Sequence, residues 1–113
     1  MSIGRRWIGV FGTTGLMQLR QPSVYMLTNK RNGVLYVGVT SDLVQRIWQH
    51  RSGFVSSFTR HHGAYNLVWY ERHETLESAI RREKLLKKWH RRWKLALIEN
   101  TNPYWNDLYS TLL

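Results

Sequence analysis

Two tyrosines near the start of the chain are the residues best suited by type and spacing to do chemistry. Tyr25 lies in the string Val-Tyr-Met and Tyr36 in the string Tyr-Val-Gly, on either side of Asn32-Gly33. Asn-Gly is a strong hairpin signal, because both residues tolerate the positive φ of a tight primed turn. We therefore expect neighbouring strands that hold two phenols close together, and phenols can orient water or a phosphate oxygen.

A helix expected just after this hairpin carries the next candidates. Leu43, Arg46, Ile47 and His50 occupy positions i, i+3, i+4 and i+7, which share one helix face. The two apolar residues would anchor that face to the sheet. Arginine can donate two hydrogen bonds to a phosphate, and histidine can move a proton near neutral pH. Taken alone, this pattern is better explained by an arginine and a histidine that border the core.

A second, strongly basic helix carries Glu83, the one acidic residue between Arg81 and Lys94. Projection at 100° per residue places Glu83 on the apolar arc of that helix. An inward carboxylate is costly unless it is paired or binds a metal, and Arg82 projects close enough to be a plain ion-pair partner. The arc consists of Leu76, Ala79, Ile80, Leu86, Trp89 and Trp93. The basic residues, either a solvated face or a surface that follows phosphates, are Arg81, Arg82, Lys84, Lys87, Lys88, Arg91 and Arg92.

The elements that must position these residues follow from hydrophobic pattern and capping signals. Strands are predicted over residues 24–28, 34–39 and 67–71. Helices are predicted from about residue 42 to 51, from 76 to 89 or beyond, and over 93–99. Thr40, Ser41 or Asp42 would cap the first helix and Thr75 the second. The polar stretch 52–63 is predicted to be a loop.

Size and charge limit the possible classes of function. The chain has 113 residues, a formal charge of +10 and no cysteine. This predicts one compact domain over residues 22–113, preceded by a loosely packed extension over 1–21. The positive charge favours DNA or RNA as partner, and no apolar run approaches the length of a membrane span. The lack of cysteine is consistent with a cytoplasmic protein.

The ordered set of these motifs resembles the GIY-YIG nuclease superfamily, and in particular its small stand-alone bacterial members. The resemblance covers residues 23–109. It rests on the strings Val24-Tyr25-Met26, Tyr36-Val37-Gly38, Leu43-x-x-Arg46-x-x-x-His50, Ala79-x-x-x-Glu83 and Asn102-Pro103-x-Trp105-x-Asp107-Leu108-Tyr109. In two places the chain departs from the family pattern. Val24 and Met26 replace the first motif's Gly and Ile-like positions, and Val39-Thr40 stand where some relatives carry a lysine.

The resemblance implies a fold and a set of roles. The fold is α/β of the α+β kind, with a small three-stranded antiparallel sheet flanked by helices. Tyr25 and Tyr36 would activate water and position the phosphate, with His50 as a helper. Arg46 would stabilise charge on the phosphate, and Glu83 would bind a divalent metal, Mg²⁺ or Mn²⁺. The family's late asparagine is best matched by Asn106, with Asn102 as the competing candidate.

The sequence therefore predicts a metal-dependent endonuclease or nickase that acts on DNA, including single-stranded or branched DNA. It is expected to be a monomer or weak homodimer, with no membrane association. The alternative is a non-catalytic nucleic-acid-binding module that uses the same basic surface, and RNA is also a possible substrate. A binding module would not need Tyr25, Tyr36, Arg46 and Glu83 to converge, so their convergence discriminates between the two.

Overall fold

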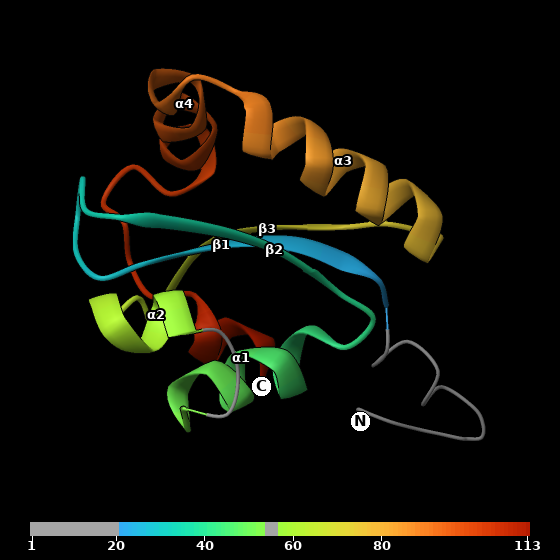
Figure 1. Ribbon diagram of the computed structural model, residues 1–113, viewed down its shortest axis with the longest axis horizontal. Coiled ribbons are helices and arrows are strands. Elements are labelled where there is room, and N and C mark those ends of the chain that lie inside the picture. Colours follow the sequence, from blue (N-terminus) through green and yellow to red (C-terminus); the bar gives the residue numbers. More distant parts are fainter. Residues whose placement is uncertain (1–20, 54–56) are drawn as a thin grey trace.

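A three-stranded antiparallel sheet with helices on both faces forms the domain, as predicted (Figure 1). The computed structural model describes residues 21–53 and 57–113, so the predicted extension lies outside the described residues except for Gln21. In chain order the elements are β1 (Ser23–Thr28), β2 (Leu35–Thr40), α1 (Leu43–Arg51), α2 (Ser57–His62), β3 (Asn66–Arg72), α3 (Leu76–Lys88), α4 (Arg91–Thr101) and the short 3₁₀ helix η2 (Tyr109–Leu112). Among the described residues, no helix has the length and apolarity needed to cross a membrane.

The strands and the three longer helices agree with the predicted ranges to within about two residues, but the predicted loop over 52–63 is wrong in part. It contains the helix α2. The apolar periodicity that identifies longer helices is lost in a six-residue segment of mostly polar side chains. The predicted caps are confirmed where the structure tests them: the Asp42 carboxylate accepts from the Gln45 amide, and Thr75 Oγ1 accepts from the Ser78 amide.

The hairpin between β1 and β2 is confirmed, but its turn differs from the predicted two-residue turn. The last paired residues are Thr28 and Leu35, so the connection is longer. Within it the Gly33 amide donates to the Lys30 carbonyl, and only Asn32 has a positive φ, 59°. Gly33 is needed for space instead, because a Cβ there would lie 2.0 Å from Asn29 Oδ1.

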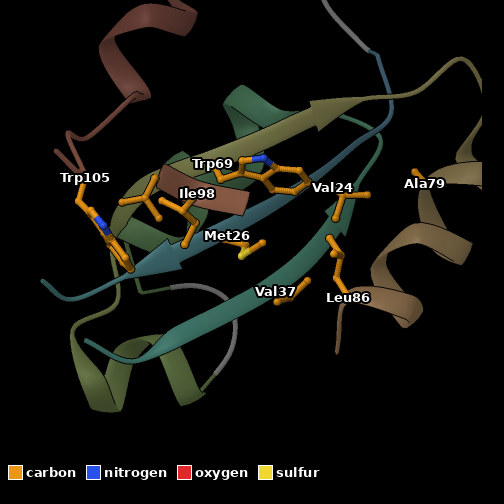
Figure 2. Close-up of a cluster of buried hydrophobic side chains, with 9 residues drawn as sticks. Val24, Met26, Val37, Trp69, Ala79, Leu86, Ile98 and Trp105 are labelled. Atoms are coloured by element: carbon orange, nitrogen blue, oxygen red, sulfur yellow. The ribbon is translucent and has the colours of Figure 1, made fainter. Parts of the chain in front are cut away.

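One face of the sheet is covered by α3 and α4, which lie above it in Figure 1. Even-numbered residues of β1 and odd-numbered residues of β2 point to this side. Leu76 and Trp93, predicted to face inward, are instead 44% and 48% exposed. Leu76 is the first residue of α3, and Trp93 does not continue its arc because α3 ends at Lys88 and Trp93 belongs to α4. The core here consists of Val24, Met26, Val37, Val68, Trp69, Ala79, Leu86, Ile98 and Trp105 (Figure 2).

The opposite face is covered by α1, α2 and the C-terminal segment with η2 (Figure 1). Its buried residues are Tyr25, Leu27, Leu43, Ile47, Ala64 and Leu67. The pairing of β3 with β1 contains a β-bulge. Leu67 pairs with Leu27 and Trp69 pairs with Met26, so Val68 is an extra residue without a partner in β1. Val68 and Trp69 therefore pack against the α3–α4 side, and Leu67 against the α1 side.

Asn102, at the end of α4, fastens the C-terminal segment to the sheet. It is buried, and its Nδ2 donates to the carbonyls of Val68 at 3.0 Å and Asn106 at 2.9 Å. Its Oδ1 accepts from the Asn106 amide at 3.0 Å. All three bonds satisfy backbone groups that would otherwise lose a partner, which gives Asn102 a structural task.

We expect Asn102→Ala to lower the free energy of unfolding by about 2–3 kcal/mol, because it leaves buried backbone groups unsatisfied. Asn106→Ala is the matched control, since the Asn106 side chain is exposed and only its backbone takes part in these bonds. Urea denaturation of both variants checks this. Equal stabilities for the two would contradict the assignment.

Candidate active site

Tyr25 lies at the centre of the candidate site, and its ring crosses β2 over Gly38. The two residues pair directly across the strands. A Cβ on Gly38 would come within 2.4 Å of both Oη and Cζ of Tyr25, so no larger residue fits there without movement. Tyr36 packs on the same side of the sheet, and its ring centroid is 6.3 Å from that of Tyr25. The glycine of the second motif therefore provides the space for the phenol of the first.

His50 connects the two tyrosines to the helical layer. It lies on α1 beside the buried Leu43 and Ile47 and is itself 1% exposed. Its Nε2 lies 2.8 Å from the Tyr25 hydroxyl, and its Nδ1 lies 3.1 Å from Thr59 Oγ1 on α2. The Tyr36 ring is 5.2 Å from the imidazole in an edge arrangement.

The electrostatic surroundings decide which of these groups carries the proton. Burial raises the pKa of Tyr25 above its usual value, and negative charge on Tyr36 and Glu83 adds to this, while Arg46 opposes it by its charge and a hydrogen bond. Burial, and then the Arg46 guanidinium, lower the pKa of His50 to about 4. At neutral pH the phenol is therefore protonated and the imidazole neutral. A neutral imidazole has one donor and one acceptor nitrogen, so it makes one of its two contacts with Tyr25 and Thr59 as donor and the other as acceptor.

Arg46 and Glu83 reach the same cluster from different elements. Arg46 is on α1, half-buried, and acts on both Tyr25 and His50. Glu83 is on α3, which packs against β1 and β2 on the other face, yet its charge contributes to the raised pKa of Tyr25. Tyr25, Tyr36, Arg46 and His50 thus lie together on the α1 side of the sheet, and Glu83 acts on Tyr25 electrostatically from α3.

Glu83 is buried, as predicted, with Lys87 as its ion-pair partner. Lys87 Nζ lies 2.6 Å from Glu83 Oε2, with the two side chains 55% and 11% exposed. The predicted alternative partner, Arg82, instead bonds to Glu71 with Nε and Nη2. Within residues 21–53 and 57–113 no three His, Cys, Asp or Glu side chains converge as a metal cage. A single carboxylate still fits Mg²⁺, which keeps several waters and often takes one or two carboxylates.

Asn106 does not join this cluster through any contact seen in the described part of the chain. Its side chain is exposed, and its backbone is held by Asn102 beside β3. Asn102, the competing candidate, has its whole side chain engaged by backbone groups. The late asparagine is therefore the predicted position with the least geometric support.

Some basic side chains of the predicted DNA-binding surface have partners within the protein, and others are exposed. Arg82 and Lys87 bind Glu71 and Glu83, and Arg91 donates to the carbonyls of Asn32 and Gly33 in the hairpin. Four others are exposed and form no ion pair or hydrogen bond found among the described residues. These are Arg81, Lys84, Lys88 and Arg92.

Sequence reasoning missed three residues around the site. Thr59, fully buried, orients His50, but a threonine in a polar stretch carries no distinguishing signal. Phe58 places its ring 5.9 Å from that of Tyr36 and went unnoticed because α2 was predicted to be a loop. The Glu83–Lys87 pair was available from its i,i+4 spacing, which favours such ion pairs on helices.

The comparison with known families agrees with this geometry. The model of the GIY-YIG catalytic domain matches residues 21–96, more than half of the chain. The chain belongs to the GIY-YIG catalytic domain family. The matched range includes both tyrosines, Arg46, His50 and Glu83, and stops before Asn106. Membership of this family suggests nuclease activity and a nucleic-acid substrate.

Several bacterial relatives carry a family name without an assigned activity. A UPF0213 protein of Clostridium perfringens is 39% identical over 68% of this chain and 82% of its own length. A UPF0213 protein of Aeromonas salmonicida is 30% identical over 82% of this chain and 69% of its own length. The solution NMR structure of a UPF0213 protein from Bacillus halodurans is 33% identical, covers 73% of this chain and 86% of that chain, and gives a TM-score of 0.47.

The lowered pKa of His50 makes stability depend on pH. Because the folded value, about 4, lies below the usual 6.5, the unfolded chain binds the proton more readily between these values. The contribution is complete above pH 6.5 and is lost as pH falls towards 4. We expect about 2 kcal/mol less stability at pH 5 than at pH 7.5 from this group. Urea denaturation at both values checks this, and His50→Gln should reduce the difference by that amount. An unchanged difference would contradict it.

Proposed function

We propose that this protein is a metal-dependent endonuclease that hydrolyses phosphodiester bonds in DNA, one strand at each encounter. The observation that carries the proposal is the cluster of two phenols, a guanidinium and a neutral imidazole on one face of the sheet, with the buried carboxylate of Glu83 acting on Tyr25 from α3. Phosphodiester hydrolysis needs a polarised phosphate, an activated water and a stabilised leaving oxygen, and these groups can supply all three.

The burial of the two tyrosines supports a division of labour between them. Tyr25 has no exposed surface and its hydroxyl is engaged by His50, whereas Tyr36 is half-buried. We assign Tyr36 and Arg46 to the phosphate and the attacking water. Tyr25 and the neutral His50 form a buried pair behind them that holds the Tyr36 ring in place.

Glu83 is the proposed ligand of the divalent metal, Mg²⁺ or Mn²⁺. When bound, such an ion would act as a Lewis acid on the phosphate. The Glu83 oxygen that Lys87 does not use, Oε1, has no hydrogen bond within the described residues, and Lys87 is exposed enough to move away. The protein's own part is to hold this buried carboxylate in place on α3 beside Lys87.

The exposed basic residues of α3 and α4 are proposed to follow the DNA backbone. Arg81, Lys84, Lys88 and Arg92 offer sequence-independent attraction to phosphates, which weakens as salt increases. RNA is the alternative substrate, because the same surface attracts any phosphate backbone. A non-catalytic binding module would use the same surface, but a buried Tyr–His pair next to an arginine and a carboxylate adds nothing to simple backbone binding. The cytoplasmic location and the monomer or weak dimer remain predictions.

Cleavage of labelled single-stranded, duplex and branched DNA tests the proposal. We expect cutting that requires Mg²⁺ or Mn²⁺, and a fall of about 100-fold or more in Glu83→Gln, Tyr25→Phe and Tyr36→Phe, because each removes a group that acts in the reaction. DNA binding should persist in all three. Glu77→Gln, an exposed acid on the same helix, is the matched control and should cut normally. Salt-sensitive binding without cutting of any substrate would favour the binding module.

Lys87 competes with a cation for Glu83, so its removal should strengthen metal binding. We expect Lys87→Met to lower the dissociation constant for Mn²⁺ by about 2- to 5-fold, the range expected for a partly exposed ion pair. Electron paramagnetic resonance of free Mn²⁺, without DNA, measures this directly. Lys88→Met removes the same charge without touching Glu83 and should leave the dissociation constant unchanged. Equal effects of both variants would argue against a site at Glu83.

A further inference from the structure

A row of aromatic rings runs outward from the candidate site along α2. The Tyr36 ring lies 5.9 Å from Phe58, and the Phe58 ring lies 4.6 Å from His62. His62 in turn meets His61 edge-on at 4.9 Å. The inner end of the row contacts His50 and Tyr25, and its outer end is in solvent, with Phe58 37% exposed and both histidines exposed.

The helix that carries this row is held in place by its other side. Thr59 is fully buried and bonded to His50, and its carbonyl accepts from the Ala64 amide. Arg60 Nη1 donates to the Gly53 carbonyl at the end of the preceding turn. Phe58 and His62, at i and i+4, therefore share the face that remains towards solvent beside Tyr36.

We propose that Phe58 and His62 form a stacking surface for one unpaired nucleobase next to the phosphate to be cleaved. This rests on the proposed nuclease function. Aromatic faces bind the π-face of any base, and in a duplex those faces are covered by the neighbouring base pairs. The surface thus selects single-stranded or locally opened DNA over intact duplex.

Charge and position both favour a nucleotide as the occupant. The last turn of α2 contains Arg60, His61 and His62, and the helix has no acidic residue, which suits a polyanion. The row is continuous with the proposed phosphate-contacting residue Tyr36, so a base one nucleotide away from the phosphate would reach Phe58. A partner protein with an apolar surface would gain less from contact with a ring row flanked by these basic residues.

The test compares binding of a fluorescent single strand with that of a wholly abasic strand of equal length and charge. Fluorescence anisotropy in EDTA excludes cleavage, so the result does not depend on activity. We expect the wild type to prefer the base-bearing strand by roughly 10-fold. Phe58→Leu, which keeps apolar bulk against Tyr36 but has no π-face, should lose most of that preference, and Phe58→Trp should keep it.

Tyr104→Ala is the matched control, because Tyr104 is a 74% exposed aromatic residue outside the row. It should bind both strands as the wild type does. Thermal melting verifies that each variant is folded. A wild-type preference in Phe58→Leu, or no preference in the wild type, overturns the stacking surface even if the protein cuts DNA. Failure to cut any DNA together with a lost preference in Phe58→Leu would instead reject the nuclease and retain the stacking surface.

Discussion

The buried hydrogen bond between Tyr25 and His50 is the interaction on which the rest of the site depends. It joins the middle strand of the sheet to α1, and His50 extends the connection to Thr59 on α2. Burial of two polar groups is tolerable only because each has its partner. The bond also requires Gly38, since any side chain there would displace the Tyr25 ring. A motif glycine, a strand tyrosine and a helix histidine thus form one structural unit.

This unit has an electrostatic consequence. Low solvent access raises the pKa of Tyr25 and lowers the pKa of His50, so both groups are held in their uncharged forms. The Arg46 guanidinium adds to this effect at His50, because its positive charge disfavours a charged imidazolium beside it. Tyr36, half-buried beside the pair, then becomes the phenol with access to solvent. The same burial that stabilises the fold therefore prepares the groups for chemistry.

Local patterns predicted much of this arrangement. Spacing on α1 placed Leu43 and Ile47 inward with His50 beside them, and all three are buried. Projection of α3 placed Glu83 on the inward arc, which is confirmed, because helical periodicity depends only on positions within one segment. The two elements that were predicted wrongly are the β1–β2 turn and the segment that contains α2. The turn between β1 and β2 lengthens because Asn29 Oδ1 binds the Val34 amide, and α2 exists in a stretch without apolar periodicity.

The sequence by itself determined the elements, their order and the residue types available for phosphate chemistry, because periodicity, capping and ordered motifs are encoded within short segments. Only the tertiary structure decided which partners these residues have. Arg82 is engaged by Glu71 from β3, so Glu83 is left to Lys87, its neighbour on the same helix. The Asn102 side chain donates a hydrogen bond to the carbonyl of Val68, the extra residue of the β-bulge. Such choices depend on distances between segments far apart in the chain, and those distances exist only once the sheet and helices pack.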